Sequence, residues 1–102
     1  MWIIATMDIY PEMLDEFRAF EHHAARIMQT YGGEITQSIV TPSEEDGLLS
    51  EIHVIHFPTP QAFEGYRQDE ALQSLRAQHR HAIARQTIRI GDAGPNYHSA
   101  VS

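Results

Sequence analysis

The sequence predicts a single α+β domain in which strands and helices follow the order βαββαβ, the split βαβ arrangement of ferredoxin-like folds. Four runs rich in β-forming residues are bounded by turn residues, and two segments with helical periodicity separate them. The 102 residues leave room for one hydrophobic core. We therefore expect residues 1–91 to form one four-stranded antiparallel sheet with both helices on one face, and residues 92–102 to form a C-terminal arm.

The first strand is predicted at residues 2–9, where apolar side chains occupy both alternating positions. Such a strand is covered on both faces, which favours a central place in the sheet. Pro11 suits the first turn of the following helix, because a proline there gives up only an N–H that would be unpaired. Gly32 and Gly33 suit its end. Its apolar residues recur every three or four positions: Met13, Phe17, Phe20, Ala24, Ile27, Met28 and Tyr31.

Residues 34–41 and 48–57 are the second and third predicted strands, and the acidic turn PSEEDG between them predicts a hairpin. The strand at 34–41 alternates polar and apolar residues only loosely, so one of its faces is wetter. This pattern places it near an edge of the sheet.

The second helical region is predicted to open at Pro60, with Thr59 as its N-cap. Tyr66 lies off the apolar stripe formed further on by Leu72, Leu75, His79 and Ile83. The helix is therefore expected to break between Gly65 and Asp69, with Asp69 capping the second segment. The last strand is predicted at residues 84–90, and the arm beyond it is expected to be ordered only if Tyr97 docks it.

Charge and composition exclude several classes of protein. Fourteen acidic against seven basic residues give a net charge of −7, which disfavours nucleic acid and anionic membranes as partners. The absence of cysteine excludes disulfides and thiolate chemistry, and no export signal is evident, which makes a cytoplasmic protein the simplest expectation. Glycine-rich nucleotide loops, HExxH and GxSxG motifs are also absent from the sequence.

Both helices on one face of the sheet would leave the other face bare. Because the first and third strands are apolar on both faces, we expect a second copy of the chain to cover it. The predicted assembly is a homodimer in which two sheets close into an α/β barrel.

The chain resembles the dimeric α/β-barrel proteins of the domain-of-unknown-function 1330 family. The resemblance covers residues 1–91 and is carried by the Pro11 helix ending in Tyr31-Gly32-Gly33, by Phe57-Pro58 before a helix, and by the run from Tyr66 through Glu70 to Leu75-Arg76. It implies the ferredoxin-like fold and the dimer, and it transfers no catalytic residue. Related barrel families include cofactor-free monooxygenases of polyketide quinones, muconolactone-isomerase-like enzymes, and haem-binding or haem-degrading proteins. The acidic 42–47 turn and Glu51 depart from the family's pattern.

His79 is the foremost candidate for chemistry, since it lies in the middle of an apolar stripe and should point at the sheet. It is interpreted either as a hydrogen-bonded core histidine or as a general acid or base beside a cavity. Tyr66, just off that stripe, is the second candidate, with its hydroxyl available to a ligand.

Four further residues are candidate ligand-binding groups: His53, His56, Phe63 and Arg76. The two histidines of the third strand must face opposite sides of the sheet, and the alternation leaves open which one faces the helices. Two histidines are too few for an ordinary zinc site, so neither a metal nor a cofactor is expected.

Two functions remain open at this point. One is a cofactor-free monooxygenase or isomerase that acts on a small aromatic or conjugated carbonyl compound, in a pocket between the second helical region and the third strand. The other is a non-enzymatic dimer that binds a small hydrophobic or haem-like ligand. A third, plainer possibility is an assembly unit whose interior is filled by side chains.

Overall fold

The computed structural model describes residues 1–42 and 47–98 and contains the predicted order of strands and helices. The elements are β1 (Trp2–Ile9), η1 (Pro11–Met13), α1 (Leu14–Thr30), β2 (Glu34–Pro42), β3 (Leu49–His56), α2 (Pro60–Gln68), α3 (Glu70–His79), η2 (Arg80–Ala82) and β4 (Ile83–Gly91). The first helix differs slightly from the prediction, because Pro11 opens a short 3₁₀ turn and the α-helix begins at Leu14.

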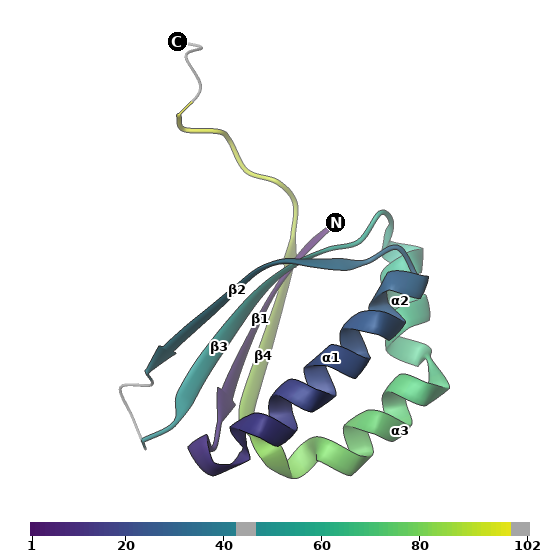
Figure 1. Ribbon diagram of the computed structural model, residues 1–102. Coiled ribbons are helices and arrows are strands. Elements are labelled where there is room, and N and C mark those ends of the chain that lie inside the picture. The colour runs from purple at the N-terminus through teal and green to yellow at the C-terminus, as the bar shows by residue number, and fades with distance from the viewer. Residues whose placement is uncertain (43–46, 99–102) are drawn as a thin grey trace.

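The four strands form one antiparallel sheet in the order β2-β3-β1-β4. The first strand is therefore central and β2 lies at an edge, as the hydrophobic patterns predicted. All three α-helices gather on one side of this sheet, while residues 92–98 run away from the domain (Figure 1). The ferredoxin-like fold class is confirmed.

Alternation along β1 separates the core from the open face of the sheet. Its odd-numbered side chains, from Ile3 to Ile9, are buried beneath the helices. They meet the apolar stripe of α1, whose buried members are Phe17, Phe20, Ala24 and Met28. The even-numbered side chains of β1 point to the opposite face, because successive residues of a strand alternate.

The open face carries an apolar patch that no described part of the chain covers. Ile4 is 47% exposed and Ile39 is 48% exposed. In the strand register Ile4 is opposite Val54, and Ile39 is opposite Ile52, so these four side chains share one face.

The break in the second helical region occurs at Asp69, as predicted. Its Oδ1 accepts a hydrogen bond from the backbone N–H of Leu72 at 3.0 Å, and its Oδ2 accepts one from the Tyr31 hydroxyl at 2.7 Å. Asp69 therefore starts α3 and also ties the helix junction to the end of α1. Thr59 caps α2 in the same way, since its hydroxyl oxygen accepts from the N–H of Ala62.

The β2–β3 turn and the C-terminal arm are described only in part. The acidic residues 43–46 of the predicted turn lie outside the described residues, and Gly47 beside them has a left-handed φ of +64°. In the arm, Tyr97 is 87% exposed and so does not dock onto the domain. Within the described part of the chain, none of the helices has the length and apolar character needed to cross a membrane.

Gly33 provides a test of the packing between α1 and Phe57, the residue that follows β3. A Cβ at this buried position would lie 2.5 Å from the Phe57 ring and 2.7 Å from Met28. We expect Gly33→Ala to lower the free energy of unfolding in urea by about 1–3 kcal/mol, because an overpacked core must shift. Gly94→Ala is the control, since nothing lies within 4 Å of a Cβ there. Equal unfolding midpoints for both variants would contradict this packing.

Candidate functional site

A pocket of about 440 Å³ lies where α1, the second helical region and the start of β4 meet. Such a volume is within the usual range for small-molecule sites, and the walls combine apolar and charged side chains. The lining residues used below are Phe20, Glu21, Tyr66, Arg76, His79 and Ile83.

The strand that lines this pocket differs from the expected one. The sequence placed the pocket against the third strand, whereas its strand residues belong to β4, from Ile83 to Gln86. The physical reason is the short η2 turn, Arg80–Ala82, which joins α3 directly to β4. The helix and the strand diverge from this junction and leave a space between them.

His79 lines the pocket and is oriented by a carboxylate. Its Nδ1 lies 3.0 Å from Oε1 of Glu16, and its ring is 5.8 Å from that of Phe20. A carboxylate at Nδ1 favours the tautomer with the proton there, which leaves Nε2 as a hydrogen-bond acceptor. An imidazole held in this way can accept a proton from a ligand.

Glu16 holds a second histidine as well. Its Oε2 lies 3.0 Å from Nε2 of His81, whose side chain is 59% exposed. Desolvation raises the pKa of Glu16, but the hydrogen bonds and charges of His79 and His81 outweigh this effect, so the pKa lies below its ordinary value. Glu16 therefore remains a carboxylate at neutral pH and keeps His79 in place.

Tyr66 lines the same pocket and is only 6% exposed. Burial raises the pKa of its hydroxyl to about 12, against the opposing charge of Arg76. The phenol consequently stays protonated at neutral pH and can donate a hydrogen bond. The guanidinium carbon of Arg76 lies 6.0 Å from the Tyr66 ring centroid, which brings a cation to this wall.

The other predicted ligand-binding residues lie outside this pocket. His53 faces the helices and is buried, whereas His56 lies on the open face with its ring 4.7 Å from that of Trp2. Phe63 packs in the core, 5.3 Å from the Phe57 ring. Of the four, Arg76 alone is among the residues that line the pocket.

Two carboxylates of the site were missed by sequence reasoning. Glu16 gave no signal, since its partners His79 and His81 follow 63 and 65 residues later. Glu21 did leave a signal in the sequence, because it follows Phe17 by four residues and precedes Ala24 by three. It therefore interrupts the apolar stripe of α1. Among the residues that the structure describes, no cluster of three or more suitable side chains could hold a metal ion.

No protein-family model and no curated protein matches this chain. Solved structures do. One described as an antibiotic biosynthesis monooxygenase has a TM-score of 0.65 at 18% identity, covering 92% of this chain and 98% of the other. A candidate antibiotic biosynthesis monooxygenase from Caulobacter crescentus has a TM-score of 0.69 at 15% identity, covering 92% of this chain and 89% of the other. One from Deinococcus radiodurans has a TM-score of 0.68 at 16% identity, covering 94% of this chain and 95% of the other.

These similarities establish the class of fold. The chain has the ferredoxin-like fold of structures assigned to the antibiotic biosynthesis monooxygenase type. At 15–18% identity the likeness is one of fold alone. The resemblance to the domain-of-unknown-function 1330 family finds no support in a family model.

Tyr66 allows a test of the site's electrostatics. Its folded pKa of about 12 exceeds the ordinary value of 10.0. The unfolded chain therefore loses this proton first, and the stability that the protonated phenol contributes below pH 10 is lost as the pH rises to about 12. We expect Tyr66→Phe to flatten this fall in the free energy of unfolding, measured by urea denaturation at increasing pH. If the free energy of unfolding of the wild-type protein and of Tyr66→Phe fell in parallel with pH, the raised pKa of Tyr66 would be contradicted.

Proposed function

We propose that this protein is a cofactor-free monooxygenase or isomerase that removes a proton from a small aromatic or conjugated carbonyl compound. The observation that carries the proposal is the convergence of His79, Tyr66 and Arg76 on one pocket of about 440 Å³. A cavity of this size argues against an interior filled only by side chains.

Each of the three residues has a distinct part in this chemistry. His79, oriented by Glu16, takes the proton through Nε2 as a general base. The resulting enolate carries its charge on oxygen, where the protonated hydroxyl of Tyr66 and the guanidinium of Arg76 stabilise it. The ring of Phe20 and the side chain of Ile83 provide apolar surface for a planar ligand.

The enolate has two possible fates. Returning the proton to a different carbon gives an isomerase. Reaction with O₂ forms a C–O bond and a hydroperoxide, and loss of water then converts one CH₂ and one O₂ into one C=O and one H₂O. The monooxygenase descriptions of structures with the same fold favour the second fate for this chain.

Binding without turnover is the second candidate function. The apolar wall formed by Phe20 and Ile83 would suit a small hydrophobic or haem-like ligand held by His79. This alternative predicts that compounds bind in the pocket without exchange of their protons or consumption of O₂.

His79→Gln tests the catalytic proposal. With β-tetralone in D₂O, and with anthrone in aerated buffer, we expect the variant to lose about 10²–10⁴-fold in the rate of α-proton exchange and of O₂ uptake, because the general base is absent. Proton NMR and an oxygen electrode measure the two rates. His23→Gln is the matched control, since His23 is an exposed histidine of α1.

Three outcomes of this experiment decide the proposal. Loss of rate in His79→Gln alone, with unchanged thermal unfolding, supports it. Equal rates in the wild-type protein and in His79→Gln would remove His79 from the mechanism. Binding of both probes by the wild-type protein without exchange or O₂ uptake would favour the second candidate function.

We also propose that the open face of the sheet is covered by a second copy of this chain, forming the barrel dimer. Its apolar patch, Ile4, Ile39, Ile52 and Val54, supports this, because monomeric proteins seldom expose such a contiguous surface. A sheet face that meets its own copy also satisfies the twofold symmetry of common dimers.

Ile4→Glu tests the dimer. A charge in the middle of the patch should yield a monomer in sedimentation or light-scattering measurements, because pairing would bury it. The control is Ile90→Glu. Ile90 is 58% exposed, but it is paired with Ile3 in the strand register and so lies on the helix side of the sheet. A wild-type monomer, or a dimer that survives Ile4→Glu, would exclude this interface.

A further inference from the structure

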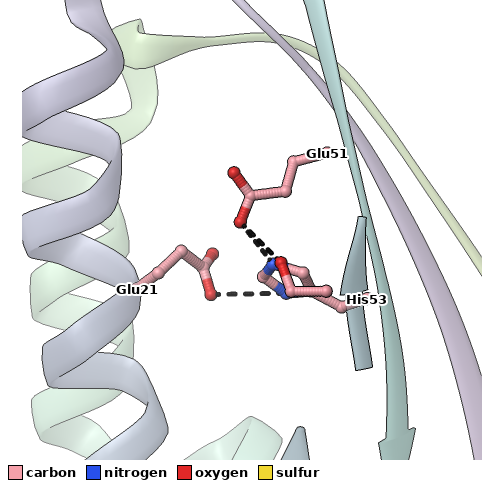
Figure 2. A network of polar contacts seen from close by, with 4 residues as sticks. Glu21, Glu51 and His53 are labelled. Carbon is pink, nitrogen blue, oxygen red and sulfur yellow. Dashed lines mark hydrogen bonds and ion pairs between the residues drawn. The ribbon is translucent and has the colours of Figure 1, made fainter. Parts of the chain in front are cut away.

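A second group of titratable side chains lies behind the pocket, between α1 and β3. His53 is buried, and its two ring nitrogens each face a carboxylate. Nε2 lies 2.8 Å from Oε1 of Glu51, and Nδ1 lies 3.7 Å from Oε2 of Glu21. Figure 2 shows Glu21 reaching from its helix toward the strand that carries the other two residues. The chemistry proposed above uses none of the three.

The charges of this cluster do not balance unless protons are shared. The side chains of His53, Glu51 and Glu21 are 4%, 9% and 18% exposed, respectively. With a neutral imidazole, two carboxylates would face each other in a poorly hydrated space, which is costly. A proton on His53, on Glu21 or on both removes this cost.

Other polar groups facing the cluster come from three elements. Ser38 of β2 donates to Oε1 of Glu51 at 3.2 Å, whereas Oε2 of Glu51 is buried without a partner among the described residues. Arg18 of α1 lies beside the cluster, and Arg76 of α3 acts on Glu21 through its charge.

Glu21 is the residue shared by the pocket and the cluster. It lines the 440 Å³ pocket together with Tyr66 and Arg76. It also lines a second hollow of about 250 Å³, together with His53 and Glu51. Since its carboxylate meets His53 at ion-pair distance and not at hydrogen-bond distance, it remains available to a ligand on its other side.

We propose that Glu21 is a second acid–base residue of the pocket and that His53, held by Glu51, supplies and withdraws its proton. This inference rests on the proposed function, which assigns the first proton transfer to His79. Burial raises the pKa of Glu21, and the charge of His53 opposes this effect. A raised pKa favours the protonated carboxyl group that a general acid requires.

The proton balance assigns each residue a step. When His79 has removed a proton from one carbon, Glu21 protonates the enolate at another carbon. In the reaction with O₂, Glu21 instead protonates the terminal peroxide oxygen; the O–O bond then breaks, the second hydrogen of the same carbon leaves with this oxygen as water, and the carbon keeps the other oxygen as C=O. Glu21 then recovers a proton from His53, a step that requires the two side chains to close from 3.7 Å to hydrogen-bond distance. The 250 Å³ hollow is bordered by the exposed residues Arg18 and His22, so His53 can be reprotonated from solvent on that side. His79 releases its own proton to solvent, and the protein returns to its initial state.

An infrared titration tests the coupling of Glu21 and His53 without any substrate. As the pH is raised above the ordinary glutamate pKa of about 4.3, the wild-type protein should still show the C=O band of a protonated carboxyl group. The band should be missing from Glu21→Gln and retained in the control Glu64→Gln, whose glutamate is exposed. In His53→Gln the midpoint of the band should rise, because the neighbouring positive charge is lost. A band that persists in Glu21→Gln, or a midpoint unchanged in His53→Gln, overturns the coupling.

Turnover of β-tetralone and anthrone tests the catalytic part. We expect Glu21→Gln to lower kcat by about 10²-fold or more and to remove one limb of its pH profile, with partial rescue in Glu21→Asp. We expect His53→Gln to shift that limb and Glu64→Gln to change nothing. If Glu21→Gln lowered kcat by the same factor at every pH, the role of Glu21 would be structural and the inference would be overturned.

The two proposals fail in different ways. If the wild-type protein turns over the probes and Glu21→Gln has an unaltered pH profile, the role of Glu21 is refuted while the proposed function stands. If the wild-type protein exchanges no protons and takes up no O₂, the proposed function fails and the catalytic role of Glu21 fails with it. The infrared result still decides whether Glu21 and His53 form one titrating unit.

Discussion

The burial of one face of β1 under α1 is the constraint on which the rest of the structure depends. Its odd-numbered residues, from Ile3 to Ile9, lie beneath the aromatic and aliphatic stripe of the helix. A shift of one residue in the pairing would move every buried side chain to the open face, so this burial fixes the register of the sheet. With the register fixed, the residues of β3 that are buried beneath the helices are Glu51, His53 and Ile55.

The presence of Glu51 and His53 on that buried face is unusual, because charged groups are costly to desolvate. The helix adds a further carboxylate, Glu21, among the apolar residues that cover the sheet, 3.7 Å from Nδ1 of His53. A core that needed only stability would fill these positions with apolar side chains, since a buried ionic group seldom stabilises a fold more than good packing does. The acid–base role that we propose for Glu21 would account for a cluster that stability alone does not require.

The pocket arises from a different feature, the junction of α3, η2 and β4. Asp69 sets the direction of α3 through its cap and its bond to Tyr31, and η2 turns the chain into the edge strand. These local devices bring Tyr66, Arg76 and His79 to one space with Glu16 and Glu21 of α1.

The sequence by itself determined the order of elements, the central place of β1, the edge place of β2 and the helix break at Asp69. Each depends on local signals, namely the alternation of apolar residues, caps and turn residues, which act over a few positions. Only the tertiary structure decided that β4 lines the pocket, that His53 faces the helices, and that Glu16 holds His79 across 63 residues. These outcomes depend on how elements distant in the chain pack against one another, and no local pattern specifies which polar side chains such packing brings into contact.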